Sequence, residues 1–353
     1  MKKLLKVLLI LILALVCCVV LLFGWLTLTE YKPEPVEEAP VKLTGDAGAV
    51  KPGQELTILS WNVGYGGLGK DSDFFMDGGK DSRSADRETV GRYLEGARRT
   101  IDEVQPDIVL LQEVDIDSSR SYGIDEREVL GRGMSAETFA LNYSCPFVPV
   151  PVPPIGKVHS GLYTVTDGLT IDSAYRISLP CPFSWPTRIA NLKRCLLVSY
   201  LPIEGSDKQL VLVNLHLEAY DDGLGKLAQT NQLRVFINAQ YEKGNYVIAG
   251  GDFNQVFPGS LARYPNTHIE NWAPGVLDID MLPQGWNLAN DLTVPTCRLL
   301  NQPYDPSDTV GTQYYVIDGL ILSPNVTLVS AKTVDAQFEN SDHNPVKVEV
   351  VLN

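Results

Sequence analysis

The sequence predicts an α/β domain in which two packed, mixed β-sheets are covered by helices, preceded by one helix long enough to span a membrane. Three observations support this fold class. An unbroken apolar segment stands near the N-terminus, strand-like and helix-like segments alternate in the first part of the remaining chain, and strand-like segments cluster toward its end. Alternating elements followed by a run of strands are typical of mixed sheets with helices packed outside them.

The N-terminal segment has the length and charge pattern of a membrane anchor. Lys2, Lys3 and Lys6 precede an apolar run from Val7 to Leu26, which at roughly 1.5 Å per residue crosses a bilayer core of about 30 Å. A cleavable signal peptide is the alternative. The apolar core of a signal peptide is usually shorter than this run, and no small-x-small cleavage site follows Leu26. We therefore expect an uncleaved anchor over residues 1–28. Because basic residues precede the span, we expect the N-terminus in the cytoplasm and the rest of the chain outside, at the cell membrane.

A segment rich in proline and glutamate follows the anchor. Residues 29–54 contain four prolines among several glutamates, a composition typical of an extended linker. We interpret this segment as a stalk and residues 55–353 as the folded domain.

The folded domain begins with a strand, a helix and a second strand. Residues 56–63 and 106–114 are short apolar runs bounded by chain breakers, a pattern typical of buried strands. Between them, apolar residues recur at spacings of three and four from Val90 to Val104, which predicts a helix that ends before Pro106. A loop rich in Gly and Asp over residues 64–84 follows the first strand, and long loops are usually functional or disordered.

Strands dominate the later part of the chain. Residues 194–203 and 209–219 have the pattern of two strands joined by a hairpin turn. Helical spacing over residues 223–243 precedes another buried strand, residues 247–251, and a proline-rich irregular region follows at 258–310. Three further strands are predicted at 313–323, 325–334 and 344–352.

The composition argues against a general polyanion-binding protein. The net charge is −14, and the part after the anchor is more negative still, because the N-terminal segment carries three lysines. Proteins that bind nucleic acid through its phosphates usually present a basic surface. A nuclease is not excluded, since bound divalent cations can supply local positive charge. The four cysteines outside the anchor form no C-x-x-C pair, which argues against zinc and leaves disulfides and buried thiols equally open.

Polar side chains gather where the predicted strands end. They are Asn62, Gln112, Glu113, Asn214, His216, Asp252, Asn254, Asp318, Asp342 and His343. Ligand and catalytic groups concentrate at strand ends, where the scaffold is rigid, although single cases such as Gly-Gly-Asp are ordinary turn chemistry. Asp318 interrupts an apolar strand and must find a partner or shift its pKa. A histidine is the natural partner, whereas His159 and His268 lack an acidic neighbour and are interpreted as structural.

Glu113, Asp252 and Asp342, together with Asn62 and Asn254, form a set of oxygen donors. Hard oxygen ligands suit Mg²⁺, Mn²⁺ or Ca²⁺, and Mg²⁺ sites typically combine one or two carboxylates with phosphate oxygens of a substrate. The set therefore predicts a phosphate-handling site that uses Mg²⁺, with Mn²⁺ or Ca²⁺ as alternatives.

Six short motifs occur in the order found in one known family. They are W-N (61–62), Q-E (112–113), N-x-H (214–216), G-D-F-N (251–254), I-D (317–318) and S-D-H-x-P-V (341–346). From about Leu56 to its C-terminus the sequence resembles the endonuclease/exonuclease/phosphatase superfamily, which includes DNase I-like nucleases, abasic-site endonucleases, neutral sphingomyelinases and inositol-polyphosphate 5-phosphatases. Each motif alone is weak evidence, whereas six in the family's order are specific.

The resemblance implies a four-layer α/β sandwich, with residues 55–353 as the catalytic domain and the site at one end of the two sheets. It implies that Glu113 ligates the divalent metal, with Asn62 and Asp342 beside it. Asp252 would orient or deprotonate the attacking water, and Asn254 would hold a phosphate oxygen.

The resemblance also implies roles for the histidines. His343, paired with Asp318, and His216 would bind the phosphate and stabilise charge in the transition state. Positioning and charge stabilisation are the main needs of in-line attack on phosphorus, so elementary chemistry agrees with these roles.

The residues and the resemblance together predict a membrane-anchored, extracytoplasmic, metal-dependent phosphoesterase, acting as a monomer on a phosphodiester such as a lipid head group. The aromatic stretch Phe74–Met76 fits either contact with a bilayer or packing within its own loop. An extracytoplasmic DNase I-like nuclease, for which nucleic acid is only a substrate, is the main alternative. A non-catalytic binding module is the alternative from another class, but its site should have lost at least one key acid or histidine, and none is lost.

Overall fold

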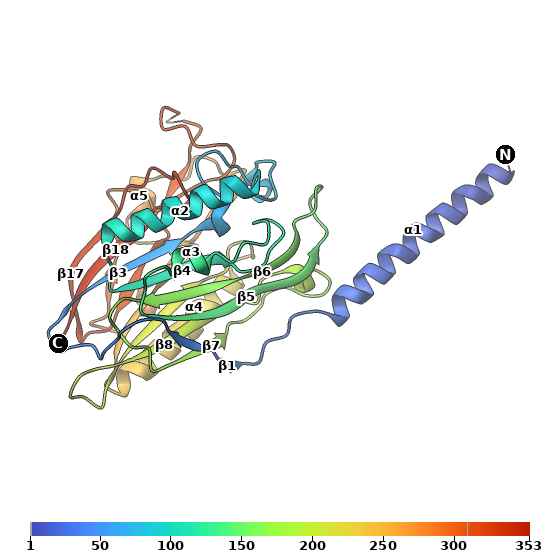
Figure 1. Ribbon diagram of the computed structural model, residues 1–353. Coiled ribbons are helices and arrows are strands. Elements are labelled where there is room, and N and C mark those ends of the chain that lie inside the picture. The colour runs from blue at the N-terminus through green and yellow to red at the C-terminus, as the bar shows by residue number, and fades with distance from the viewer. Residues whose placement is uncertain (1, 309) are drawn as a thin grey trace.

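The computed structural model describes residues 2–308 and 310–353. A long helix, α1 (Lys2–Leu28), projects from a body built on two seven-stranded sheets (Figure 1). Among the described residues, α1 is the one helix long and apolar enough to cross a membrane. Each sheet contains one parallel and several antiparallel strand pairs, so both are mixed, as predicted.

The first sheet carries the helix α2 (Arg87–Val104) on its outer face (Figure 1). Its strands, in spatial order, are β17 (Val326–Thr333), β18 (Val346–Leu352), β3 (Glu55–Asn62), β4 (Ile108–Asp115), β6 (Gly156–Thr166), β5 (Ala136–Val148) and β2 (Val41–Leu43). The Asp86 side chain accepts a hydrogen bond from the Thr89 backbone N–H and begins α2. Val90, Leu94 and Ile101 then pack on the sheet, which is the apolar face that the sequence spacing predicts.

The second sheet carries the helix α4 (Leu224–Glu242), whose Leu233 and Ile237 join the apolar cluster on that face. Its strands, in spatial order, are β1 (Val36–Glu38), β7 (Ser173–Ser178), β8 (Cys195–Pro202), β9 (Gln209–His216), β10 (Tyr246–Asp252), β16 (Asp318–Leu322) and β13 (Asn287–Ala289). Strands β9 and β10 are parallel because α4 connects them.

The two sheets pack against each other through one apolar core. Ile58 and Leu110 contribute from the first sheet, and Leu197, Leu212 and Ile248 from the second. The order helix, sheet, sheet, helix confirms the predicted four-layer α/β sandwich.

Several elements lie outside the predicted pattern. Strands β5, β6 and β7 were not expected. For β5 and β6 the reason is that register shifts interrupt their pairing and break the apolar alternation. The predicted strand 313–323 is divided in two at Val316 and Ile317. The short elements are η1 (Gly64–Gly66), η2 (Phe75–Asp77), α3 (Arg127–Leu130), η3 (Thr187–Ala190), β11 (Gln255–Val256), α5 (Ser260–Arg263), β12 (Gly275–Val276), η4 (Ile279–Met281), β14 (Cys297–Arg298) and β15 (Tyr314–Tyr315).

The segment expected to be a stalk is partly built into the fold, which corrects that expectation. β1 pairs with β7 at the edge of one sheet, and β2 pairs with β5 at the edge of the other. Pro35 and Pro40 stand next to these strands rather than inside them, where a missing N–H breaks no ladder hydrogen bond. Residues 36–43 therefore join the edges of both sheets. The proline- and glutamate-rich composition of this segment gave no sign of the two strand pairs.

The six cysteines are free thiols in the described structure. Cys145, Cys195 and Cys297 are buried, which favours the buried-thiol interpretation over disulfides. Burial raises the pKa of the Cys195 thiol to about 11, so this thiol is a neutral core residue.

A glycine allows β9 and β10 to approach at the end of the sheet that carries the predicted site. Gly251 has φ 148°, and a Cβ atom there would lie 1.9 Å from the Leu215 carbonyl oxygen. We expect Gly251→Ala to lower the free energy of unfolding by about 3 kcal/mol or more, because both backbone strain and a backbone clash oppose the methyl group.

Gly91 in α2 is the matched control, since a Cβ atom there meets nothing within 4 Å. Gly91→Ala should raise the free energy of unfolding by about 0.5–1 kcal/mol through helix propensity. Urea denaturation of both variants checks the pair, and a Gly251→Ala midpoint equal to that of the wild type would contradict the expectation.

Candidate functional site

The eight predicted site residues converge at one end of the two sheets. Seven of them line a single cavity of about 620 Å³: Asn62, Glu113, His216, Asp252, Asn254, Asp342 and His343. Asp318 lies behind this wall, in contact with His343. Side chains that are up to 281 positions apart in the chain, such as Asn62 and His343, thus face one space.

Strand register places three of these residues in one row. His216 is the register partner of Asp252 across the parallel β9–β10 pair, and Asp252 is the partner of Asp318 across the antiparallel β10–β16 pair. Because side chains alternate along a strand, partners in register lie on the same face. The row therefore follows from the sheet itself and not from a flexible loop.

Glu113 reaches the cavity through a break in the β4 ladder. The register of β4 against β6 shifts between Leu111 and Val114, and Glu113 has φ 57°. A left-handed conformation at a residue other than glycine costs on the order of 1–3 kcal/mol. The bulge turns the Glu113 carboxylate toward the cavity, where it remains 23% exposed.

Two residues of the predicted motifs are structural. Gln112 Nε2 donates to Asn214 Oδ1 at 2.8 Å, and Asn214 Nδ2 donates to the carbonyl oxygens of Leu111 at 3.0 Å and Tyr163 at 3.1 Å. All of these groups are buried, so their hydrogen bonds join the two sheets directly below the cavity.

Asp252 is held by two amide donors. Asn62 Nδ2 donates to Asp252 Oδ2 at 3.1 Å and to Glu113 Oε1 at 3.2 Å, while the Asn254 backbone N–H donates to Asp252 Oδ1 at 2.8 Å. Burial, and then the charge of Asp318, raises the pKa of Asp252 to about 7. A carboxylate with this pKa exchanges protons readily at neutral pH.

His343 and Asp318 form the predicted buried pair. Asp318 Oδ2 lies 2.8 Å from His343 Nδ1, which leaves Nε2 at 3.8 Å from Asp252 Oδ2. Burial lowers the pKa of His343, but the charge of Asp318 outweighs burial and raises this pKa well above its usual value. His343 is therefore an imidazolium at neutral pH.

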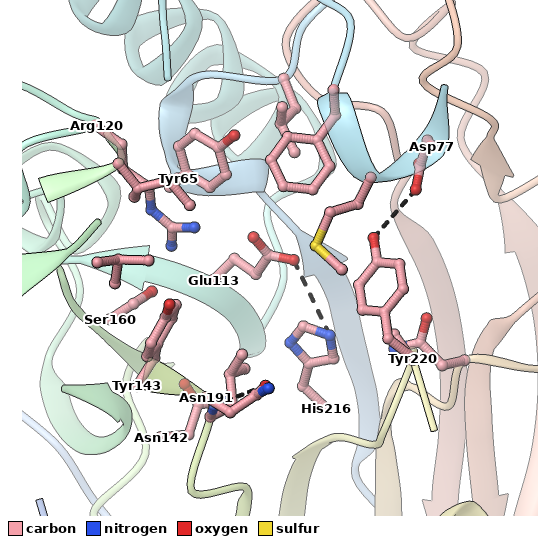
Figure 2. Close-up of a pocket in the computed structure, with 18 of the residues that line it drawn as sticks. Tyr65, Asp77, Glu113, Arg120, Asn142, Tyr143, Ser160, Asn191, His216 and Tyr220 are labelled. Atoms are coloured by element: carbon pink, nitrogen blue, oxygen red, sulfur yellow. Dashed lines mark hydrogen bonds and ion pairs between the residues drawn. The ribbon is translucent and has the colours of Figure 1, made fainter. Parts of the chain in front are cut away.

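His216, unlike His343, is a neutral imidazole. Its Nε2 atom lies 3.5 Å from Asp252 Oδ2. The same atom lies 4.0 Å from Glu113 Oε1, a pair that Figure 2 marks with a dashed line. Burial, reinforced by the charges of Arg194 and His343, lowers the pKa of His216 well below its usual value. The Nδ1 atom of this neutral imidazole is buried without a hydrogen-bond partner among the described residues.

The carboxylates of the cavity repel one another. Burial raises the pKa of Asp342 to about 6, and the charge of Glu113 adds to the rise while His343 opposes it. Glu113 and Asp342 bring carboxylate oxygens to the cavity, and Asn62 lies beside them, with its Oδ1 atom accepting a hydrogen bond from the Gly64 N–H at 3.0 Å. A divalent cation among them would relieve this repulsion, so the residues fit a hard cation such as Mg²⁺.

Two other clusters are compact enough to hold a metal. They are Cys297 with Asp342 and His343, and Asp252 with Asp318 and His343. Both depend on His343, whose Nδ1 atom is already bonded to Asp318 and whose protonated state cannot ligate a metal. The oxygen set around Glu113 is therefore the better candidate.

Arg120 is a cavity residue that sequence reasoning did not find. It makes two hydrogen bonds to Asp115, at 3.1 Å and 2.9 Å, and its guanidinium lies 3.7 Å from the centre of the Tyr65 ring. Figure 2 shows Arg120 and Tyr65 on the same side of Glu113. Its position in a polar loop offers no sequence signal, because only the tertiary fold buries that loop.

Asp77 and Tyr220 form a second group that sequence reasoning missed. Tyr220 Oη donates to Asp77 Oδ1 at 3.1 Å, and both side chains line the cavity (Figure 2). Burial, and then the charge of Asp342, raises the pKa of Asp77 to about 7. Asp77 belongs to the Gly- and Asp-rich loop, whose unusual length was the available signal.

Comparison with known proteins agrees with this geometry. The family model described as "Endonuclease/Exonuclease/phosphatase family" matches residues 59–343. No curated protein sequence is similar enough to count as a match.

Solved structures with the same fold have low sequence identity. An endonuclease/exonuclease/phosphatase from Beutenbergia cavernae DSM 12333 has a TM-score of 0.53 at 16% identity, covering 85% of this chain and 72% of its own. ANGEL2, a 2',3'-cyclic phosphatase solved with adenosine-2',3'-vanadate, has a TM-score of 0.52 at 14% identity, covering 90% and 99%. A family protein from Leptotrichia buccalis C-1013-b has a TM-score of 0.51 at 17% identity, covering 83% and 98%.

The crowded carboxylates predict a stability response to metal. We expect Mg²⁺ or Mn²⁺ to raise the melting temperature, because a cation that binds only the folded state stabilises it. Glu113→Gln should weaken this binding by on the order of tenfold or more, since it removes a charged ligand. The same variant should melt higher than the wild type in EDTA, because Asp342 loses a repulsive neighbour.

Differential scanning fluorimetry with and without metal measures both effects. Glu204→Gln, in the exposed turn between β8 and β9, is the matched control and should behave as the wild type in both conditions. If metal raised the melting temperature of Glu113→Gln as much as that of the wild type, Glu113 would not be a ligand of the cation.

Proposed function

The chain belongs to the endonuclease/exonuclease/phosphatase family, whose members are hydrolases of phosphoric esters, and on that premise we propose that it is a divalent-metal-dependent phosphodiesterase. We further propose that α1 anchors it in the membrane as a monomer, with the catalytic domain outside the cytoplasm. Lys2, Lys3 and Lys6, in the first turns of α1 and ahead of its apolar run, support this orientation.

One observation carries the proposal: a base, a protonated histidine and a set of oxygen donors face the same cavity. Asp252 supplies the base, His343 the positive charge, and Glu113 the principal oxygen ligand. Phosphodiester hydrolysis needs these three functions within a few ångströms of one phosphorus atom.

The oxygen donors define the cation's place. Glu113 and Asp342 would hold Mg²⁺, or Mn²⁺ or Ca²⁺ in its stead, with Asn62 beside them, since the Asn62 Oδ1 atom already accepts a hydrogen bond from the Gly64 N–H. When bound, the ion neutralises charge on the phosphoryl oxygens. Asn62 also donates to Asp252, so the same amide would keep the base oriented beside the ligand set.

Asp252 activates the water in this proposal. Its carboxylate would accept a proton as the water oxygen attacks phosphorus and the bond to the leaving-group oxygen breaks. A pKa of about 7 makes Asp252 a stronger base than an ordinary carboxylate, while a large fraction stays ionised at neutral pH. Asn254 would hold a phosphate oxygen, since only one N–H of its amide is committed, to the Leu217 carbonyl at 2.9 Å.

The two histidines would bind the phosphoryl group in different ways. His343 would donate from Nε2 as an imidazolium, held in orientation by Asp318. His216 would donate as a neutral imidazole, which adds a hydrogen bond without adding to the repulsion from Arg194 and His343. Both contacts would strengthen as charge develops on the phosphoryl oxygens.

The direct test is hydrolysis of bis(p-nitrophenyl) phosphate by the full-length protein in detergent, with Mg²⁺, Mn²⁺, Ca²⁺ or EDTA. We expect activity only with metal, and a loss of about 10²–10⁴-fold in kcat in Glu113→Ala and His343→Ala. His268→Ala is the matched control, because this histidine is not among the residues that line the cavity. Folded protein without metal-dependent turnover, or full activity in His343→Ala, would refute the proposal.

The pH profile tests the roles of Asp252 and His343. Activity requires ionised Asp252 and protonated His343, so kcat/KM should rise through the pKa of Asp252 and fall above that of His343. Asp318 raises both pKa values. Asp318→Asn should therefore lower both, moving both limbs of the profile to lower pH, and should reduce the maximum about 10²-fold.

Asp207→Asn, in the exposed turn between β8 and β9, is the control for loss of a carboxylate and should keep the wild-type profile. Superimposable profiles for Asp318→Asn and the wild type would exclude His343 as the protonated group.

A further inference from the structure

We propose that the apolar part of the cavity is a subsite for the hydrocarbon tail of a membrane amphiphile, which enters sideways from the bilayer beside α1. The inference rests on the proposed function, because it names the substrate class of that same site: a lipid phosphodiester.

The cavity has two chemically different parts. The catalytic groups line one part, and the other is lined by apolar side chains that include Phe23, Phe75, Val148, Ile155 and Leu192. A phosphoryl group uses none of these side chains. Apolar surface facing an open cavity is unfavourable in water, so its extent indicates a ligand with a substantial apolar portion.

The apolar lining is continuous with the end of the membrane-anchor helix. Phe23 of α1 lines the cavity, and Leu22, Phe23 and Leu26 pack with Val148 and Ile155 in one apolar cluster. Leu26 is only 2% exposed. The helix that would lie in the bilayer therefore forms part of the cavity wall and is more than a tether.

Polar contacts fix α1 in this position. Thr27 Oγ1 accepts a hydrogen bond from Trp185 Nε1 at 3.1 Å, and Glu30, directly after the helix, pairs with Arg188 at 2.8 Å and Lys193 at 3.4 Å. The Glu30 side chain is 1% exposed and that of Arg188 is 41% exposed, so separating the pair would leave the buried carboxylate without this partner. The catalytic domain is thus held at a defined orientation to the helix.

Exposed apolar side chains surround the same end of the domain. Val150 and Val152, at the tip of the β5–β6 hairpin, are 62% and 93% exposed, and Trp185 is 56% exposed. Figure 1 shows the hairpin on the side of the body from which α1 projects. With α1 in a bilayer, these residues would lie near the membrane surface, where Trp and apolar side chains are stable.

These features favour a lipid over a nucleic acid. Phosphates next to the scissile one in a polynucleotide would require basic partners. The two arginines that line the cavity, Arg120 and Arg194, are already paired with Asp115 and Glu218. Beyond the catalytic part, the lining includes Phe, Val, Ile and Leu side chains. An acidic protein with net charge −14 adds to the repulsion of a polyanion. A lipid presents one phosphodiester and directs its remaining bulk into apolar surroundings.

Two synthetic phosphodiesters with the same reacting centre test the proposal without assuming a head group. Methyl p-nitrophenyl phosphate lacks a tail, and hexadecyl p-nitrophenyl phosphate carries one. Full-length protein in phosphatidylcholine nanodiscs with Mg²⁺ should hydrolyse the hexadecyl diester with a kcat/KM at least about tenfold higher, because the tail is transferred to an apolar site.

Ala190→Phe is the decisive variant, since Ala190 lines the cavity and packs against the apolar cluster that includes Val148 and Ile155. The added ring should lower kcat/KM for the hexadecyl diester about tenfold or more and leave the methyl diester unchanged. Ala262→Phe, on the exposed α5 helix, is the matched control and should change neither value.

A second variant keeps the proposal testable if Ala190→Phe fails to fold. Val152→Glu, on the exposed hairpin tip, should slow the hexadecyl diester only, whereas Val235→Glu, on the exposed face of α4, should slow neither. Equal rates for both diesters, or equal losses on both in Ala190→Phe, would overturn the tail subsite while the phosphodiesterase assignment stands. Hydrolysis of plasmid DNA faster than that of the hexadecyl diester would replace the lipid with nucleic acid. No hydrolysis of either diester would overturn both proposals.

Discussion

The register of three adjacent strands is the constraint on which the site depends. It aligns His216, Asp252 and Asp318 in one row, and side chains on a strand alternate, so a slip of one residue would turn any member of the row to the opposite face. Gly251 permits this register, because a Cβ atom there would collide with the Leu215 carbonyl. The apolar core between the sheets fixes the strands, and the site residues at the strand ends are therefore held rigidly as well.

Burial of charge explains how an acidic protein can handle phosphate. In the cavity, desolvation raises the pKa values of Asp77, Asp252 and Asp342, while the buried contact with Asp318 keeps His343 protonated. Carboxylates in such proximity favour a bound cation, and a cation together with an imidazolium offsets the negative field at one point. The overall composition is acidic, but a bound cation and the His343 imidazolium would supply positive charge within the cavity.

The N-terminal segments are part of the folded domain and reach the wall of the cavity. Residues 36–43 pair with the edges of both sheets, and Glu30 and the last turns of α1 pack against the domain. In the proposed membrane arrangement, a helix fixed in this way would limit the orientations of the cavity relative to a bilayer. Phe23 of this helix lines the cavity, so the proposed tail subsite would give the helix a part in substrate binding as well as in localisation.

Local pattern was enough to predict the alternation of strands and helices, the mixed sheets and the polar residues at strand ends. The family resemblance carried by the motifs added the four-layer order and the eight candidate site residues, which the structure brings to one end of the sheets. A carboxylate inside an apolar strand needs a partner, which also made the pairing of Asp318 with His343 predictable. Only the tertiary structure decided the bulge that turns Glu113 into the cavity, the burial of Arg120, the contact of Asp77 with Tyr220, and the docking of α1. Periodicity and propensity act over a few neighbouring residues, whereas these features arise from contacts between segments far apart in the chain, whose energies exist only once the sheets have packed.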